Sequence, residues 1–218
     1  MTHFRKIALA SAAIGAFMAV GTAASAQGFA SGNWYGKAFG GATWMQDQSG
    51  DVDSRGDKIA DGDASYDAGY TLGLGVGYNY TPNFAFELEY AYRDADTETD
   101  IGGADFGGST NSNAVMLNAL YKFDGMGAMG AVVPYVGGGL GWADMESDID
   151  DIGSFTRDNA FAWQVMGGVG YDINPNVSLF GEVRYFATDE GTLDGPDGLS
   201  WEAQVETVDL LVGLTYKF

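Results

Sequence analysis

The chain has 218 residues, of which 30 are Asp or Glu and only 10 are Lys or Arg, so its formal net charge is −20 at pH 7. Such a chain lacks the basic surface that binds nucleic-acid phosphates, and we expect no nucleic-acid partner. Hydrophobic residues make up 46% and aromatic residues 14% of the chain, which excludes a disordered acidic protein. Cysteine is absent and His3 is the only histidine, which excludes disulfides, thiolate metal sites and cysteine nucleophiles.

The start of the chain is typical of a cleaved secretory signal peptide. Two cations precede an uncharged, mostly apolar run over residues 7–20, and a small-residue cleavage pattern ends at Ala26. The apolar run is shorter than the roughly 20 residues that a membrane-spanning helix needs. The sequence therefore predicts a signal peptide at 1–26 and an exported domain at 27–218 that contains neither histidine nor cysteine.

The rest of the chain alternates with a period of two. Residues 70–80 place Tyr and aliphatic side chains on one face, and Gly, Thr and Asn on the other. A strand sorts residues in this way, whereas a helix would scatter them around its circumference. Eight such segments are predicted, at Trp34–Met45, Gly69–Tyr80, Phe84–Arg93, Ser112–Phe123, Val132–Ala143, Ala160–Ile173, Val177–Thr188 and Val205–Phe218.

The connections between these segments alternate in length. Two are tight Pro-containing turns at 81–83 and 174–176, and a third short one spans residues 124–131. Short turns at one end and long loops at the other are typical of an eight-stranded, antiparallel up-and-down barrel. The four remaining connections are predicted to be long acidic loops, at Gln46–Ala68, Asp94–Asn111, Asp144–Asn159 and Asp189–Gln204.

Two all-β classes fit this pattern, a soluble lipocalin-type barrel with an apolar interior and a transmembrane barrel with an apolar exterior. One face of each strand carries almost no polar residue, and the other is rich in Gly, Thr and Asn, which suits a narrow lumen. We therefore predict an all-β transmembrane barrel. Glycines such as Gly73, Gly75 and Gly77 share the inner face, where we expect them to leave small water pockets.

The charged residues of the predicted strands share that same inner face. Because an Arg or Lys facing hydrocarbon at the bilayer midplane costs about 2–4 kcal/mol, we expect these side chains to pair inside the lumen. Glu87 or Glu89 with Arg184, and Glu182 with Arg93, are the pairs we predict. The predicted interior charges are Lys37, Glu87, Glu89, Arg93, Lys122, Glu182, Arg184, Asp209 and Lys217.

Aromatic residues gather near the ends of the segments. Trp34 and Trp44 lie ten residues apart on one face, which at the usual rise and tilt places them roughly 25 Å apart along the membrane normal. This is the separation of two interfacial aromatic girdles. The predicted girdle residues are Trp34, Trp44, Tyr78, Tyr80, Trp142, Trp163, Tyr171 and Tyr216.

With its signal peptide, eight alternating segments, the run from Pro134 to Trp142 and the terminal Leu-Thr-Tyr-Lys-Phe, the chain resembles the small outer-membrane β-barrel family of Gram-negative bacteria. This family includes the OmpA-type transmembrane domain and Opa-like surface antigens. The resemblance implies an outer-membrane location and contacts with membrane lipid and lipopolysaccharide. Tyr216 and Phe218 resemble the C-terminal signal that the barrel assembly machinery reads. Because the chain stops at Phe218, we expect no peptidoglycan-binding domain.

We expect a non-enzymatic structural or surface-interaction protein that presents its acidic loops outside the cell. A narrow porin-like channel is the alternative; a specialised adhesin and a lipid-modifying enzyme are less favoured. Residues 51–57 resemble the start of a calcium loop, but Arg55 occupies a ligand position and Gly62 replaces the closing Glu. We therefore predict no specific metal site and no cofactor, only divalent cations bridging acidic loops to lipopolysaccharide. Glu87 and Glu89 suit ion pairs better than acid–base catalysis.

Overall fold

The computed structural model describes residues 33–46, 48–54, 57–66, 68–101, 104–127, 130–149, 153–194 and 199–218. The predicted signal peptide lies outside these residues. Within the described ranges, no helix is both long and apolar enough to span a bilayer.

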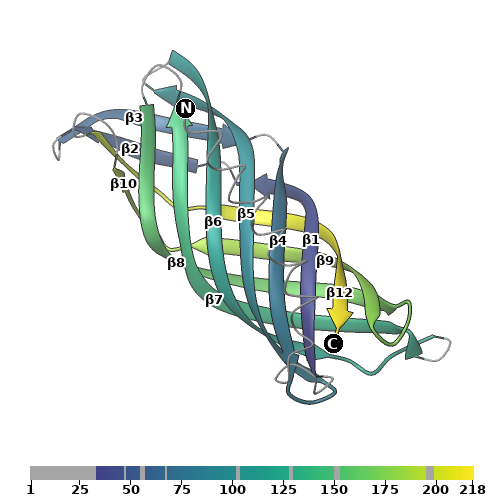
Figure 1. Cartoon of the computed structure of the whole chain (residues 1–218). Coiled ribbons are helices and arrows are strands. Elements are labelled where there is room, and N and C mark those ends of the chain that lie inside the picture. Colours follow the sequence, from purple (N-terminus) through teal and green to yellow (C-terminus); the bar gives the residue numbers. More distant parts are fainter. Residues whose placement is uncertain are drawn as a thin grey trace.

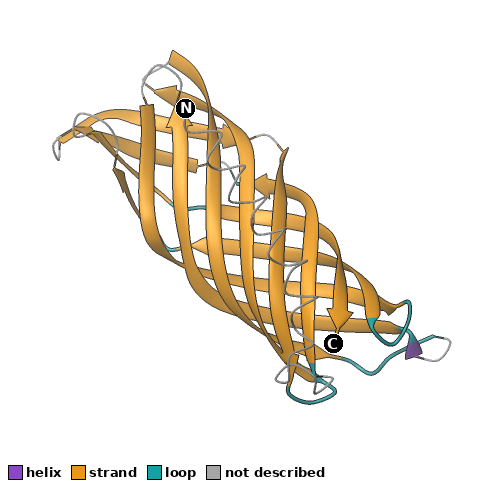
Figure 2. Ribbon diagram, in the orientation of Figure 1, coloured by secondary structure: helices purple, strands orange, loops and turns teal. Residues whose placement is uncertain are grey.

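Eight long antiparallel strands form a closed barrel (Figures 1 and 2). Each strand pairs with the next one around the ring, and β12 closes it on β1, from Tyr35 opposite Lys217 to Met45 opposite Thr207. The predicted fold class is therefore confirmed. The eight strands are β1 (Trp34–Met45), β4 (Ala68–Asn79), β5 (Phe84–Ile101), β6 (Ala104–Lys122), β7 (Val132–Ile149), β8 (Gly153–Asp172), β9 (Val177–Thr188) and β12 (Glu206–Lys217).

One end of the barrel, which we call the turn end, carries the short connections and the C-terminus (Figure 1). Side-chain hydrogen bonds to the backbone stabilise these turns. The Thr81 hydroxyl oxygen accepts a hydrogen bond from the backbone N–H of Phe84 at 2.9 Å, and the Asn174 amide oxygen accepts one from Val177 at 2.9 Å. Such local bonds, next to a proline that fixes φ, reverse the chain within four residues.

The opposite end, which we call the hairpin end, differs from the prediction. The four segments expected to be loops contain further strand, because β5 to β8 run on past the predicted strand ends and four short strands are added. An antiparallel ladder needs only backbone groups, so it continues where the apolar alternation fades and sequence patterns no longer reveal it. The added strands are β2 (Gln48–Ser54), β3 (Asp57–Tyr66), β10 (Gly191–Asp194) and β11 (Leu199–Ala203).

These short strands form two hairpins that complete a second ring above the first. Strand β3 pairs with β5, β2 pairs with β11, and β10 meets β8 at Asp194 opposite Thr156. The long strands β5 to β8 therefore take part in both rings, whereas β1, β4, β9 and β12 end where the hairpins begin.

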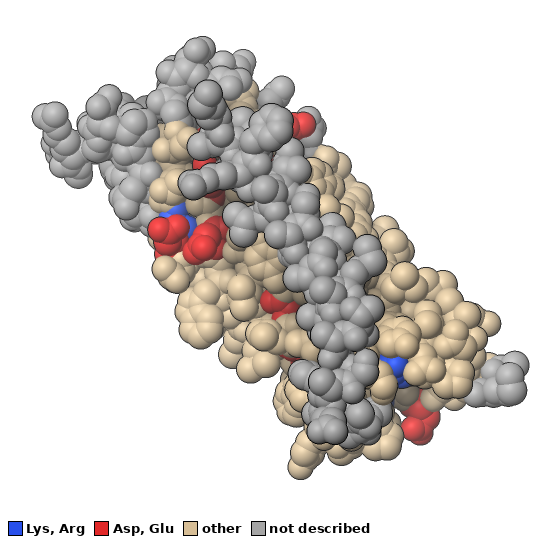
Figure 3. Space-filling view, viewed as in Figure 1, with Lys and Arg blue, Asp and Glu red and all other residues tan. Residues whose placement is uncertain are grey.

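The outer surface of the eight-strand ring is apolar. On the side shown in Figure 3, most of the described surface carries no charged residue. Large hydrophobic side chains point outward from every one of the eight strands, with exposed fractions that reach 67% at Val212. A soluble monomer rarely exposes so large an apolar patch, which marks this surface as a contact with membrane or protein. Examples, one for each strand in order, are Trp44, Leu72, Leu88, Leu117, Leu140, Val165, Val183 and Val212.

Glycines on the inner face make room for large neighbouring side chains. A Cβ atom at Gly73 would overlap the Phe39 ring, and one at Gly77 would overlap the Tyr35 ring. At Gly168 a Cβ would collide with the ring of Tyr135. The space beside these three glycines is therefore filled by aromatic rings, so the expected water pockets are absent there, whereas Gly170 does line a cavity.

We expect Gly77→Ala to lower the free energy of unfolding by about 1–3 kcal/mol, because the Tyr35 ring is held by its hydrogen bond to Glu87 and cannot swing away. Gly181→Ala is the matched control, since a Cβ there meets nothing within 4 Å. It should change stability by less than about 1 kcal/mol. Urea unfolding in detergent micelles measures both, and equal losses would contradict this account of the inner glycines.

Candidate functional site in the barrel interior

The nine charged side chains predicted for the interior lie on the inner face of the eight-strand ring. Their positions follow from the two-residue period, which sends alternate side chains of each strand to the inner face. Lys122 and Lys217, at the turn end, are partly buried. Seven others are at most 3% exposed: Lys37, Glu87, Glu89, Arg93, Glu182, Arg184 and Asp209.

Five of these residues, from β1, β5 and β9, form an ion-pair network across the bore. The Lys37 ammonium lies 3.2 Å from Glu87, 3.6 Å from Glu89 and 3.3 Å from Glu182. The Arg184 guanidinium lies 2.6 Å from Glu89 and 2.6 Å from Glu182. Neither β5 nor β9 neighbours the other in the ring, so the network ties opposite parts of the wall together.

Neutral side chains on further strands complete this ion-pair network. The Tyr35 hydroxyl donates to Glu87 at 2.7 Å, and the Tyr135 hydroxyl donates to Glu182 at 2.8 Å. The Gln164 amide donates to Glu89 at 3.4 Å. Because three carboxylates face only two cations, these donors stabilise the excess negative charge.

A separate ion pair lies nearer the hairpin end. Arg93 donates from Nε and Nη2 to one Asp209 oxygen, at 3.1 and 2.9 Å. The other Asp209 oxygen accepts from the hydroxyls of Thr43 and Thr207, at 2.6 and 2.9 Å. The guanidinium also lies 4.0 Å from the centre of the Phe186 ring, which favours a cation over its face.

The predicted pairings are partly right. Arg184 does pair with Glu89, but Glu182 pairs with Arg184 and Lys37, and Arg93 pairs with Asp209. The Glu182–Arg93 prediction was wrong because strand alternation gives the face of a residue but not its height. The tilt and stagger of the strands around the closed ring fix that height, and they bring Arg93 of β5 to Asp209 of β12 and not to Glu182 of β9.

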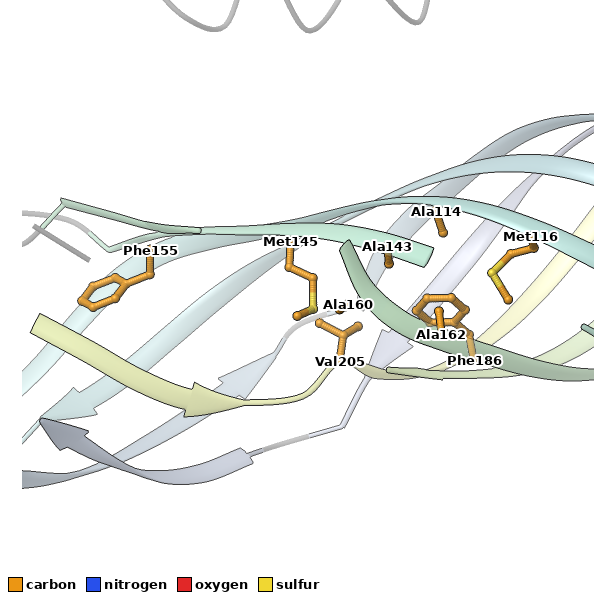
Figure 4. Packing of buried hydrophobic residues seen from close by; sticks show 9 residues of the cluster. All are labelled: Ala114, Met116, Ala143, Met145, Phe155, Ala160, Ala162, Phe186 and Val205. Atoms are coloured by element: carbon orange, nitrogen blue, oxygen red, sulfur yellow. The ribbon is translucent and has the colours of Figure 1, made fainter. Parts of the chain in front are cut away.

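Beyond the Arg93–Asp209 pair, the bore is filled by an apolar cluster (Figure 4). Met145, Phe155, Phe186 and Val205 converge there from β7, β8, β9 and the residue before β12. Small alanines on β6, β7 and β8, namely Ala114, Ala143, Ala160 and Ala162, leave room for these larger groups. A second apolar cluster, which includes Leu120 and Phe180, lies nearer the turn end, so apolar packing fills the bore on both sides of the charged residues.

At the turn end the bore widens into a cavity of about 100 Å³, which we call the vestibule. Lys122 lines it and donates a 2.7 Å hydrogen bond to the side-chain oxygen of Asn79. Lys217 lines it as well and lies 3.2 Å from Asp172.

Sequence reasoning missed the neutral partners of the ion-pair network. Tyr35, Tyr135 and Gln164 lie on the same inner face as the charges, which was a usable signal. Some interior polar atoms are buried without a hydrogen-bond partner, among them Arg93 Nη1 and the hydroxyls of Thr71 and Ser112. These are groups that commonly bind internal water.

Aromatic side chains lie on the outer face near both ends of the eight-strand ring. Trp34 and Tyr78 are in contact at the turn end, with ring centres 5.0 Å apart. Trp163 and Tyr185 are in contact towards the hairpin end, with ring centres 5.4 Å apart. The other predicted girdle residues lie on the same outer face: Trp44, Tyr80, Trp142, Tyr171 and Tyr216.

This arrangement favours charge neutralisation over catalysis. The Glu87 and Glu89 carboxylates are buried and each is held by a cation, which suits a structural role better than proton transfer. Within the described residues, no group of three His, Asp or Glu side chains is placed to hold a metal ion.

Solved structures with the same architecture are outer-membrane barrels. OprG from Pseudomonas aeruginosa superposes with a TM-score of 0.66 at 22% identity, over 85% of this chain and 96% of that one. Neisserial surface protein A gives 0.56 at 20% identity, over 86% and 98% of the two chains. AlkL, solved in lipid bilayers, gives 0.53 at 23% identity, over 88% and 93%. At these identities the likeness concerns the fold alone.

No curated protein matches the chain in sequence. A family model does, and its match extends over residues 12–218, which is nearly the whole chain. With the closed ring of eight strands, its apolar outer face and its charged bore, this match establishes that the chain belongs to the outer membrane protein β-barrel domain family.

Proposed function

We propose that this barrel is closed to solutes and serves as a structural and surface-interaction protein of the outer membrane. The observation that carries this proposal is the ion-pair network, which joins β1, β5 and β9 through the middle of the bore. With Tyr35, Tyr135 and Gln164 it extends to β7 and β8. An eight-stranded barrel is only wide enough for its side chains, so these contacts leave little room for a solute.

The hairpin end is the proposed interaction surface. Outer-membrane barrels keep their short turns in the periplasm and their longer connections outside the cell. By this rule β2, β3, β10 and β11 lie outside, on a barrel that holds them as a rigid mount. Their sequences are strongly acidic, which supports contact with lipopolysaccharide through divalent cations as well as with partner proteins.

The apolar outer face supports the membrane location. Its large exposed side chains are aliphatic or aromatic on all eight strands, and aromatic pairs lie near both ends. Tyr216 and Phe218 are in contact, with ring centres 5.5 Å apart, at the end of β12. We propose that they form the signal through which the assembly machinery receives the barrel.

A narrow channel is the second candidate. It is favoured by the vestibule and by the buried polar atoms without partners, including Arg93 Nη1 and the Asn118 amide nitrogen, which would suit a water-filled path. The apolar cluster and the ion-pair network oppose such a path, because an ion crossing them would lose its hydration.

Leu74 tests the membrane face, because it points outward near the middle of β4. We expect Leu74→Arg to reduce barrel assembly severely, since an Arg at the midplane costs about 2–4 kcal/mol. Leu74→Ala should be mild by comparison. Heat-modifiable electrophoretic mobility after refolding into vesicles measures assembly, and equally small effects of the two changes would show that this face does not contact lipid.

Planar-bilayer recording tests closure. We expect no steady conductance from the wild-type barrel, and a stable wild-type conductance that shifts in Arg184→Ala would overturn the proposal. Removing Arg184 leaves the buried carboxylates of Glu89 and Glu182 without this cation, at a cost of about 3–5 kcal/mol. We therefore also record the double variant in which both Glu89 and Arg184 are replaced by Gln. Arg157→Ala is the control, since Arg157 pairs with Asp189 at the hairpin end, outside the network.

The surface role is tested by replacing residues 48–66, the β2–β3 hairpin, with a short turn. Strands β1 and β4 pair directly with each other, so the eight-strand ring should still close. We expect weaker attachment of cells to surfaces without increased detergent sensitivity. Detergent sensitivity alone would favour a purely structural role, and an effect on neither property would contradict a surface role for this hairpin.

A further inference from the structure

The vestibule is a cavity with a defined size and wall. It measures about 100 Å³ and is lined by inner-face residues of seven of the eight strands. A cavity of about 150 Å³ admits a benzene molecule, so this one has the size for a phosphate or acetate ion and little more.

Three lysines and two carboxylates line this cavity, so one lysine has no carboxylate partner in its wall. Lys37 contacts Glu87 within the ion-pair network, and Lys217 contacts Asp172. Lys122 differs from both. Among Lys37, Arg93, Lys122, Arg157, Arg184 and Lys217, the cations whose side chains the structure describes, only Lys122 has no carboxylate oxygen within 4.0 Å.

The contacts of Lys122 leave part of its hydrogen-bonding capacity unused. An ammonium group has three N–H donors, and Asn79 accepts from one of them at 2.7 Å. The ammonium also lies 4.7 Å from the centre of the Tyr35 ring. The Tyr35 hydroxyl donates its hydrogen bond to Glu87 and not to a group bound at Lys122. The excess negative charge of the ion-pair network is therefore already bound by other donors and does not contact Lys122.

The rest of the wall combines a few polar groups with an apolar surface. Leu120, Val133 and Phe180 reduce the local dielectric constant, which strengthens the attraction between Lys122 and an anion. The Thr215 hydroxyl supplies a further donor on the wall. Asp172 repels an anion, but the Lys217 ammonium and the Ser178 hydroxyl both donate to its Oδ1 oxygen, which offsets part of its negative charge.

We propose that the vestibule is a binding site for a small oxyanion, a carboxylate or phosphate group, centred on the Lys122 ammonium. The site opens at the turn end, which faces the periplasm in the orientation proposed above. The anion enters from that side, either dissolved or as the phosphate of a lipid headgroup. The ion-pair network above the site prevents its passage further along the bore.

Phosphate binding to the micellar barrel in phospholipid-free detergent, followed by ³¹P line broadening, tests the proposal. Lys122→Met should weaken binding by about tenfold or more, the loss expected for one charge-assisted hydrogen bond. Lys122→Arg should keep binding, and so should Arg157→Met at the other end. Electrophoretic mobility verifies that each variant is folded. Unchanged phosphate binding in a folded Lys122→Met barrel would overturn the proposal.

Chloride at equal ionic strength distinguishes a site from charge screening. Phosphate and acetate should protect Lys122 from an amine-acylating reagent, scored by peptide mass, whereas chloride should protect it much less. Equal protection by all three anions would overturn the proposal.

A second pair of samples separates the two sources of the anion. In phosphate-free buffer, protection of Lys122 in phosphatidylglycerol vesicles but not in micelles assigns the site to a lipid headgroup. Protection that needs dissolved phosphate in both settings assigns it to a soluble anion, and protection in neither setting would refute the site. These readouts are independent of conductance, so the closed-barrel proposal and this one fail separately.

Discussion

An ionised side chain at the midplane of a bilayer is expensive, and a strand that crosses a membrane has only one other direction in which to send it. This constraint places the charged residues in the middle of the eight-strand ring, such as Lys37, Glu89 and Arg184, in the bore. There they cannot be hydrated freely, because eight strands enclose a space that side chains nearly fill. They must therefore neutralise one another. Among the side chains that the structure describes, the bore of the eight-strand ring holds five cations and five carboxylates: Lys37, Arg93, Lys122, Arg184 and Lys217 with Glu87, Glu89, Asp172, Glu182 and Asp209.

The ion pairs do more than cancel charge. Lys37 and Arg184 bind carboxylates from strands that do not neighbour each other, so they hold the walls together across the bore. A buried pair of this kind contributes little net stability compared with apolar packing, but losing one partner is costly. We infer that the ion-pair network fixes which strands face one another. The glycines act in the same direction, since Gly73 and Gly77 admit the rings of Phe39 and Tyr35 that shield these charges.

Different constraints act on the two ends of the molecule. Within the eight-strand ring, the outer face of each strand must be apolar to contact lipid, and the inner face must fit a narrow bore. At the hairpin end the ladder continues through β2, β3, β10 and β11, in a part of the sequence that is acidic and weakly patterned. The second ring gives a broad surface on a stiff support. Because the acidic second ring and the eight-strand ring below it follow different constraints, the fold alone does not specify a ligand.

The sequence by itself determined the eight membrane strands and the face of each charge, because a period of two sorts side chains whatever their partners are. It placed the end of β1 at Met45 and the start of β5 at Phe84, where tight turns or apolar patterns mark the boundary. Only the tertiary structure decided that Arg93 pairs with Asp209, that Tyr35 and Tyr135 serve the ion-pair network, and that the long connections form a second ring. The physical reason is register: the stagger between strands sets the height of each residue in the bore, and it depends on closure of the whole ring rather than on any local pattern.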